Sequence, residues 1–262
     1  MAEAGLGHYV YCVTSADAQP ALADATGVDR AHSVEMLRHA GLAAVAGRVS
    51  LAEFGAEPLK RNLNDLDWLA RTARLHQKVL DRALAAGAIV PLRMCTIYAD
   101  EAHVRQMLER EHDALALTLA RLGDRTEWGV KLIADVQALR EAAGAGPESG
   151  AEQSGRAYFE RRGRQRRSHE EAQRLGEQAA TEVHERLRHE AAAATILRPQ
   201  SRELSGREGE MVLNGAYLVD RARVERFRAA AEELGERQRP LGLALEVTGP
   251  WPPYNFVEPR GG

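Results

Sequence analysis

Residues Leu241–Phe256 read LGLALEVTGPWPPYNF and carry the two clearest structural signals of the chain. Between Leu241 and Val247, leucine and valine alternate with small or charged residues, which predicts a half-buried strand. Three prolines follow within four positions, at Pro250, Pro252 and Pro253. Because proline has no backbone N–H to donate, we expect the strand to leave its sheet at Pro250.

The same prolines hold three aromatic rings, those of Trp251, Tyr254 and Phe256, in a stiff and extended segment. Two interpretations of this segment stay open. It is either a structural clasp whose rings fold back over the edge of a core, or a rigid aromatic patch presented to a protein partner. Aromatic residues on a preordered backbone are typical of interface hot spots.

Upstream of this stretch, the sequence predicts a small α+β domain. Met211–Val219 is expected to form a strand, and Asp220 is expected to cap a helix that ends at Gly235. Strand, helix and strand in this order favour parallel pairing of the two strands. A helix from about residue 156 to residue 194 and a short strand near Ile196–Leu197 complete the domain.

The first half of the chain is typical of helices laid over a mostly antiparallel sheet. Gly41 separates two apolar runs, which predicts a hairpin. Asn64 or Asp65 is expected to cap one helix, and Asp100 is expected to cap a second that continues to Leu122. The strands expected around these helices cover residues 8–14, 34–49, 89–97 and 126–136.

The length of 262 residues favours two domains, at about 150 residues per domain. Residues 141–155, EAAGAGPESGAEQSG, are rich in Gly, Ala, Ser and Glu and indicate a flexible linker. We therefore expect an N-terminal α+β domain over residues 1–138, a linker over residues 139–155, and a C-terminal α+β domain over residues 156–262.

Composition argues against several classes of protein. The net charge is −3, and 44% hydrophobic with 28% charged residues is typical of a soluble globular chain. Two cysteines, Cys12 and Cys95, are too few for a disulfide framework. The sequence contains no apolar run near the ~20 residues of a membrane helix and no secretory signal. We therefore expect a cytoplasmic protein with no membrane segment.

Motifs for phosphate and metal binding fail on residue type or spacing. Gly150–Ala157 has the glycine spacing of a phosphate-binding loop, but Arg156 and Ala157 stand where lysine and a hydroxyl residue are needed. His184 and His189 lie five positions apart on a helix, about 140° around its axis, so they cannot share a zinc ion. We expect no catalytic residue, no metal and no cofactor, while an enzyme with an unrecognised cleft stays an alternative.

A second alternative is a nucleic-acid-binding regulator that acts through the helix Arg156–Arg167, where six arginines accompany one glutamate. However, 32 of the 35 basic residues in the whole chain are arginine, so arginine content alone is weak evidence. Acidic residues also follow at once, at Glu170 and Glu171. A solvated helix that faces a partner is the favoured interpretation of this segment.

The segment Thr248–Phe256, TGPWPPYNF, resembles the C-terminal signature of the gas vesicle protein F/L family, the accessory proteins of gas vesicle assembly. Further segments match the family in the same order along nearly the whole chain. They are Tyr9-Val10-Tyr11, Gly41–Val45, Val90–Arg93, Trp128–Lys131, Gly155–Tyr158 and Leu213–Val219. In one departure, Met94 and Cys95 stand where the family usually has an aromatic residue and a glycine before Thr96.

The resemblance implies an α+β fold with two domains. The first would be a modified ferredoxin-like α/β sandwich, and the second a smaller α+β domain with a long helix. The resemblance also implies a non-enzymatic minor gas vesicle component that binds the major shell subunit and prevents its aggregation during nucleation and assembly. Other gas vesicle accessory proteins are further expected partners, whereas nucleic acids and membranes are not. Such a protein would lie at the gas-facing surface of the vesicle, and in the cytoplasm before assembly.

The residues expected to bind a partner belong to the proline-rich segment, beside an inter-domain cleft and the long helix. They are Trp251, Pro252, Pro253, Tyr254 and Phe256. A second set consists of family signature residues with expected structural roles: Pro91, Arg93, Tyr158, Asn214, Tyr217, Thr248, Gly249 and Pro250. For Arg93, pairing with a buried carboxylate is favoured over exposure. Tyr158, Asn214 and Tyr217 are expected at core or inter-domain hydrogen-bonding positions.

Overall fold

A computed structural model of the chain describes residues 5–143, 155–199 and 209–257, without the side chains of residues 155–161 and 164. It divides into two compact units, Met1–Thr126 with Trp251–Gly262, and Glu127–Pro250. This division comes earlier in the chain than the domain boundary expected between residues 138 and 156. The C-terminal aromatic segment also returns to the first unit. Of the expected linker, residues 144–154 lie outside the described part of the chain.

The sheet of the first unit has the strand order β2-β3-β1-β4, and β5 also pairs with β1. Its strands are β1 (Leu6–Ser15), β2 (Val34–His39), β3 (Leu42–Ser50), β4 (Ile89–Pro91) and β5 (Ile97–Tyr98). All of these pairs are antiparallel. This is the order of a ferredoxin-like sheet, but residues 16–33, which connect its first two strands, contain no helix.

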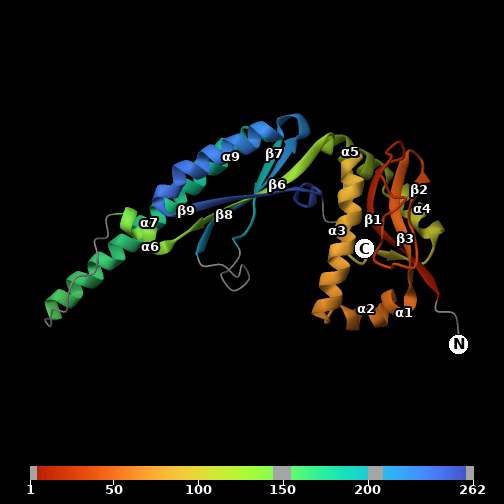
Figure 1. Ribbon diagram of the computed structural model, residues 1–262, viewed down its shortest axis with the longest axis horizontal. Coiled ribbons are helices and arrows are strands. Elements are labelled where there is room, and N and C mark those ends of the chain that lie inside the picture. Colours follow the sequence, from red (N-terminus) through yellow and green to blue (C-terminus); the bar gives the residue numbers. More distant parts are fainter. Residues whose placement is uncertain (1–4, 144–154, 200–208, 258–262) are drawn as a thin grey trace. The chain divides into compact units, whose positions relative to one another are not determined.

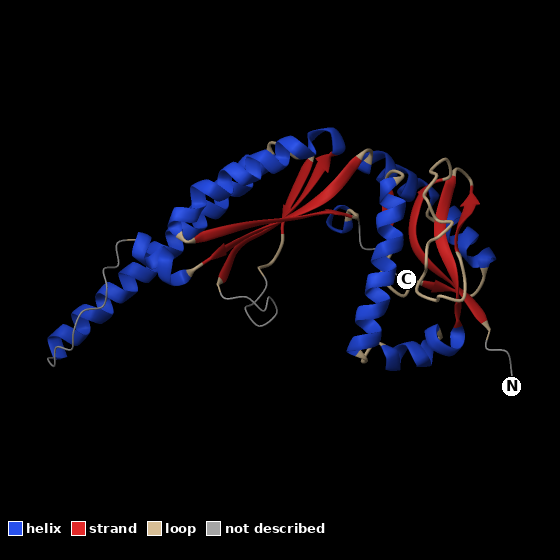
Figure 2. Ribbon diagram, in the orientation of Figure 1, coloured by secondary structure: helices blue, strands red, loops and turns tan. Residues whose placement is uncertain are grey.

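Helices cover both faces of this sheet (Figures 1 and 2). They are α1 (Leu51–Phe54), α2 (Ala56–Asn62), α3 (Leu66–Ala85), α4 (Glu101–Arg110) and α5 (His112–Leu122). In Figure 1, α3 lies on one side of the sheet and α4 on the other. As a result, β1 is buried from Gly7 to Thr14, which explains why this strand has an almost continuous apolar sequence.

The caps of the two main helices confirm the sequence prediction. The Asp65 carboxylate accepts hydrogen bonds from two backbone N–H groups of α3, and the Asp100 carboxylate accepts one from His103 N. The expected single helix from Asp100 to Leu122 is wrong, because Glu111 leaves helical geometry and separates α4 from α5. The break lets α4 pack on β2 and β3 while α5 packs on β1 and β4.

The expected strand over residues 89–97 is also interrupted. Pro91 ends β4 opposite Cys12, and the chain then makes a turn in which Thr96 N donates to Arg93 O at 3.2 Å. Cys95 occupies the left-handed region with φ of +66°. The chain rejoins β1 at Thr96, whose O accepts a hydrogen bond from Val10 N at 2.9 Å, and β5 follows. This apolar run therefore contributes two short strands and a turn.

The second unit contains a sheet of order β7-β8-β6-β9. Its strands are β6 (Arg125–Ala134), β7 (Ala193–Ile196), β8 (Glu210–Asp220) and β9 (Leu243–Trp251). Its α-helices are α6 (Val136–Ala142), α7 (Gly155–Arg188) and α9 (Val224–Gln238). In chain order this is the same strand arrangement as in the first unit, with α7 present in the first connection. Figure 2 shows α7 and α9 on one face of the sheet.

Two expectations about this sheet are wrong. The strands β8 and β9 do not pair, because β6 lies between them. The strand next to β9 is thus β6, which ends more than seventy positions before β8 begins. The strand β9 also continues through Pro250 to Trp251 instead of ending at the first proline. Since β9 is at the edge of the sheet, a missing N–H on its open side costs no ladder hydrogen bond.

A buried carboxylate connects the helices of the second unit. Glu190 is 1% exposed and forms ion pairs with Arg186 at 2.7 Å, Arg226 at 2.7 Å and Arg223 at 3.5 Å. The hydrogen bond from Arg186 lowers the pKa of Glu190, with a further contribution from the charge of Arg226. Because Arg186 belongs to α7 and Arg226 to α9, the cluster ties the end of one helix to the start of the other.

The core of the first unit contains a buried polar pair that sequence patterns did not indicate. The Tyr9 hydroxyl accepts a hydrogen bond from Cys95 N at 2.8 Å and lies 3.0 Å from His76 Nδ1. Burial raises the pKa of Tyr9 and lowers the pKa of His76 to about 4. His76 is therefore neutral in the folded protein at neutral pH and accepts the tyrosine proton in its hydrogen bond.

This pair makes folding stability depend on pH. Between pH 6.5 and about 4, His76 binds a proton in the unfolded chain but not in the folded one. The free energy of unfolding should therefore fall by roughly 3 kcal/mol as the pH drops through this window. The substitution His76→Gln retains a hydrogen-bonding side chain that does not titrate, so its urea unfolding curves should vary less with pH.

The wild-type chain and His76→Gln are compared over the same window, from pH 6.5 to about 4. Equal slopes for His76→Gln and the wild type would contradict the assignment to His76.

Candidate functional site

The C-terminal aromatic segment, Trp251 to Phe256, is anchored to the first unit. Phe256 O accepts a hydrogen bond from the Arg121 guanidinium at 2.7 Å, and the Phe256 ring is buried. The Tyr254 hydroxyl donates to Gln77 Oε1 on α3 at 3.2 Å. Pro252 and Pro253 are buried, and a 3₁₀ turn (Tyr254–Phe256) follows them. The segment is thus held at Tyr254 and at its C-terminal end.

Two of the three rings nevertheless remain accessible. Trp251 is 40% exposed and Tyr254 is 42% exposed, compared with 8% for Phe256. Burial of Phe256 agrees with the clasp interpretation. Trp251 and Tyr254 keep exposed surface, and presentation of that surface to a partner stays a prediction. Because the backbone is stiff, this surface loses little conformational entropy when a partner covers it.

The signature residues just before the aromatic segment, Thr248 and Gly249, are packed closely against β6. Gly249 has φ of +137°, and a Cβ atom there would lie 3.0 Å from Glu127 O and 3.2 Å from the Trp128 ring. A Cβ atom on Gly129 would lie 2.9 Å from Thr248 Oγ1. The segment Thr248-Gly249-Pro250 therefore lies tightly against β6, and its role in this structure is to fix β9 in place.

Arg93 differs from its expected environment. It is exposed, and within the described residues no ion pair joins it to a carboxylate. The expected pairing is therefore wrong, because Arg93 lies in the turn after β4 rather than inside a strand. Pro91 is buried in β4, opposite Cys12.

The other signature residues lie within the second unit. The Asn214 amide donates to Arg198 O at 3.0 Å and so holds the end of β7 to β8. The Tyr217 hydroxyl is 3.0 Å from His184 Nδ1 on α7, and burial raises the pKa of Tyr217. Tyr158 belongs to α7, but its side chain lies outside the described residues.

No group of three or more His, Cys, Asp or Glu side chains that could hold a metal is present among the residues that the structure describes. His184 belongs to the near-match to a zinc motif in the sequence, and its Nδ1 instead forms a hydrogen bond with the Tyr217 hydroxyl at 3.0 Å. Within the same residues, no helix is long and apolar enough to span a membrane. The glycine-rich loop around Gly150 lies mostly outside them.

The arginine-rich start of α7 is described only in part. Arg162, Arg166 and Arg167 are exposed, and Arg166 lies 3.4 Å from Glu170. Further along the helix, Arg174 pairs with Glu171 at 2.5 Å. Pairs of this kind neutralise part of the positive charge within the helix itself, as expected for a solvated face.

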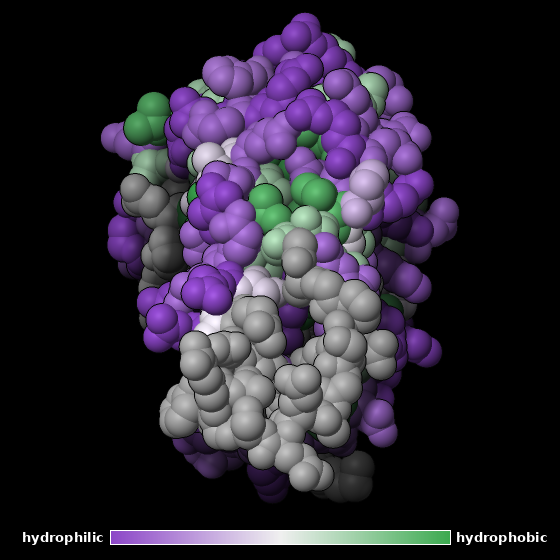
Figure 3. Space-filling model, turned by 90° about the vertical axis from the view of Figure 1, so that its left-hand side faces the viewer, coloured by the Kyte–Doolittle hydropathy of each residue, from purple (hydrophilic) through white to green (hydrophobic). Residues whose placement is uncertain are grey.

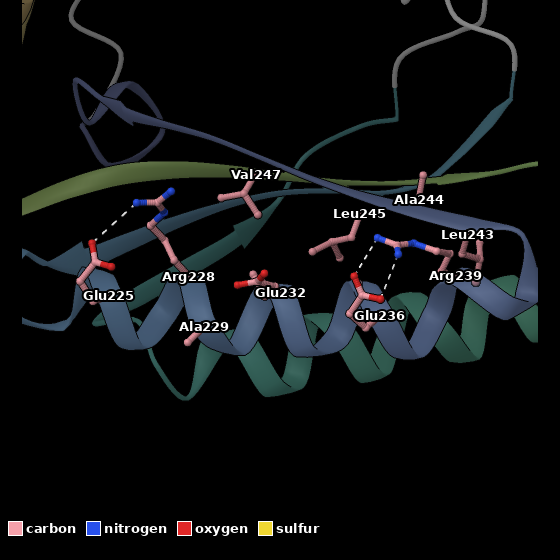
Figure 4. Close-up of a pocket in the computed structure, with 12 residues that line it drawn as sticks. Glu225, Arg228, Ala229, Glu232, Glu236, Arg239, Leu243, Ala244, Leu245 and Val247 are labelled. Atoms are coloured by element: carbon pink, nitrogen blue, oxygen red, sulfur yellow. Dashed lines mark hydrogen bonds and ion pairs between the residues drawn. The ribbon is translucent and has the colours of Figure 1, made fainter.

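A groove of about 660 Å³ runs between α9 and β9 within the second unit (Figure 4). Its floor contains Leu243, Leu245 and Val247 from alternate positions of β9, and its other side is a stripe of α9. A second groove of about 570 Å³ lies between residues 24–30 and α3 in the first unit. Neither groove is lined by Tyr9, His76 or Cys95, so the buried polar pair does not face them.

Figure 3 views the molecule from the left-hand side of Figure 1, where hydrophilic side chains cover most of the coloured surface. Near the centre of this view several hydrophobic side chains lie together, with hydrophilic ones above them and at their sides. The geometry of the described residues thus offers surfaces for binding another polypeptide: two exposed rings on a rigid segment, and a groove beside a sheet edge.

Comparison with known proteins places this geometry in a family. The family model for gas vesicle synthesis protein GvpL/GvpF matches residues 7–258. Gas vesicle protein L of Streptomyces sp. strain CB03234 is 39% identical over 254 residues, which cover 95% of this chain and 92% of that protein. Gas vesicle protein F of the same strain is 31% identical, with 95% and 99% of the two chains covered.

Solved structures share the fold. The crystal structure of GvpF from Anabaena sp. PCC7120 superposes with a TM-score of 0.71, at 19% sequence identity and over 98% of each chain. That of GvpF from Microcystis aeruginosa gives a TM-score of 0.68 at 18% identity, over 96% of this chain and 99% of the other. The α+β fold with two sheets is therefore confirmed.

Cys95 offers a test of how the chain tolerates a side chain at a left-handed position. Cys95→Gly and Cys95→Ala both remove the sulfur, but only glycine adopts a φ of +66° without strain. We expect the glycine variant to be more stable than the alanine variant by about 1 kcal/mol, measured from urea midpoints.

Met94, whose φ is not positive, gives the matched control. There the order should reverse, and Met94→Ala should be more stable than Met94→Gly. A Cys95→Ala variant as stable as Cys95→Gly would argue against strain in this turn.

Proposed function

The chain belongs to the gas vesicle synthesis protein GvpL/GvpF family, and from this membership we propose that it is a non-enzymatic accessory component that binds the major gas vesicle shell subunit. By covering that subunit it would prevent aggregation during nucleation and assembly of the vesicle. Other gas vesicle accessory proteins are further partners in this proposal. The protein would lie at the gas-facing surface of the finished vesicle.

The physical need for such a component follows from the nature of a shell. A subunit with an apolar face and unpaired strand edges aggregates unless these features are covered before assembly. The covering protein must itself stay folded and present apolar surface without associating with itself. A small number of exposed rings on a rigid backbone meets both demands.

The observation that carries the proposal is the anchored pair of exposed rings. Trp251 and Tyr254 are each about two-fifths exposed, on a segment whose neighbours Pro252, Pro253 and Phe256 are buried. Large aromatic side chains in this state are the residues that most often dominate binding energy in interfaces. The hydrogen bond from Tyr254 to Gln77 keeps one ring in position before binding.

Co-expression tests the proposed function directly. The shell subunit would be produced with and without this chain, and its share in the soluble fraction would be measured after centrifugation. We expect most of the subunit to be soluble and to copurify with the chain only when both are present. A shell subunit that is equally insoluble in both cases would refute the function.

The double variant Trp251→Ala with Tyr254→Ala tests the surface. Removal of two exposed rings should leave the melting temperature nearly unchanged but lower the copurified shell subunit by about tenfold or more. Leu66→Ala is the control, because Leu66 is 78% exposed on the same unit but lies outside the segment. It should bind as the wild type does.

Phe256→Ala separates binding from folding. Because Phe256 is buried, its truncation should destabilise the chain by about 3 kcal/mol or more. If the double variant melts as early as Phe256→Ala and loses binding only for that reason, the segment is a clasp and not a binding surface.

A further inference from the structure

The part of the edge strand β9 from Leu243 to Val247 and the neighbouring flank of α9 form a surface that the proposed aromatic site does not use. The α9 residues that line the groove recur at helical spacing, and they include Glu225, Arg228, Glu232, Gly235, Glu236 and Arg239. In Figure 4, Leu243 and Leu245 point from β9 towards α9, whereas Ala244 points away. The groove therefore has an apolar floor on the strand side and a charged rim on the helix side.

The groove is open because α9 is held on its other flank. Glu182 of α7 forms an ion pair with Arg237 and accepts a hydrogen bond from Gln238 at 3.0 Å. Arg226 is bound by the buried Glu190. These contacts hold α9 beside α7. Of the β9 residues in the floor, Leu243 is buried, but Leu245 and Val247 are only half-buried.

The charged residues at the two ends of the rim form ion pairs with one another, and an acidic residue lies between these pairs. Glu225 and Arg228 pair at 3.7 Å near one end of the groove, and Glu236 and Arg239 pair at 2.8 Å near the other. Glu232 lies between these pairs in Figure 4, and no ion pair joins it to another residue in the described part of the chain. A partner in the groove therefore meets a single negative charge at its centre.

We propose that an extended segment of the shell subunit adds to β9 as a further strand and lies in this groove. Its alternate apolar side chains would cover Leu245 and Val247, and a lysine or arginine on the same face would meet Glu232. This inference deepens the proposed function and depends on the shell subunit being the client. It assigns to that client a second contact, separate from Trp251 and Tyr254.

A strand fits this surface better than a helix for two reasons. In the described part of the chain, β9 has β6 as its one strand neighbour, so its other edge can pair with an added strand. Three of the four β9 residues that line the groove, Leu243, Leu245 and Val247, also lie at every second position, which matches the alternation of a strand rather than the spacing of a helix. Pro250 limits the added strand, because it has no N–H to offer beyond that point.

Charge reversal at the centre of the groove gives the first test. In the full-length chain co-expressed with the shell subunit, Glu232→Lys should lower the copurified subunit by about tenfold. Glu233→Lys is the matched control, since Glu233 is the next residue of α9, is exposed, and does not line the groove. It should copurify as much shell subunit as the wild type.

Filling the groove gives a second test that does not depend on charge. A Cβ atom at Gly235 would meet Leu245 Cβ at 3.6 Å, an ordinary contact, and replacing a helical glycine should not weaken the helix. Gly235→Leu should therefore leave the melting temperature at or above that of the wild type while it lowers copurification. Gly163→Leu on α7, where a Cβ atom meets no neighbour within 4 Å, is its control.

Amide hydrogen exchange reports the added strand itself. In the complex of the full chain with the shell subunit, peptides from β9 should exchange more slowly than in the free chain, and those from the opposite edge β7 should not change. Unchanged exchange of β9 in a soluble complex would overturn the inference.

The outcomes separate this inference from the function on which it rests. If the wild-type chain does not retain the shell subunit, both the function and the groove are refuted. If the wild type retains it and Glu232→Lys and Gly235→Leu do so equally, the groove is refuted while the function stands. If both variants fail and both controls bind, the inference is supported.

Discussion

One buried carboxylate, that of Glu190, ties together the helices of the second unit. Glu190 can be buried as an anion only because Arg186, Arg223 and Arg226 surround it with positive charge. These arginines come from α7, from the 3₁₀ turn before α9, and from α9 itself. Together with the contacts of Glu182 to Arg237 and Gln238, the cluster holds one flank of α9 beside α7. The opposite flank of α9 faces β9, and the groove of Figure 4 lies between them.

The strand β9 connects the two features proposed to bind the shell subunit. Its residues up to Pro250 form the edge of the second sheet, and Trp251 onwards belongs to the first unit. Close packing of Thr248 and Gly249 on β6 holds the strand where it leaves the sheet.

Both units use the strand order of a ferredoxin-like sheet, but they complete it differently. In the first unit the irregular residues 16–33 stand in the first connection, and helices lie on both faces of the sheet. In the second unit α7 occupies that connection, and α7 and α9 share one face. The expected ferredoxin-like character of the first domain is thus present in its strand order, and the second sheet shows it as well.

Local signals in the sequence were reliable at two of the three expected helix caps. The exception is Asp220, which makes no side-chain cap hydrogen bond; the helix after it begins at Val224 and ends at Gln238 rather than at Gly235. Asp65 and Asp100 cap the helices that their positions predicted, because a side chain and the N–H groups within three residues settle a cap. The turn at Gly41 between β2 and β3 was predictable for the same reason. The aromatic segment was found from its prolines, whose effect on the backbone needs no tertiary contact.

The sequence by itself thus determined the main helices, most of the strands and the family signature, since these depend on neighbours along the chain. Tertiary structure decided that β6 lies between β8 and β9, that Arg93 is exposed in a turn, and that His76 meets Tyr9 across 67 positions. It also decided which of the three rings is buried. Each of these results depends on which distant surface a residue meets, and that information is absent from any local pattern.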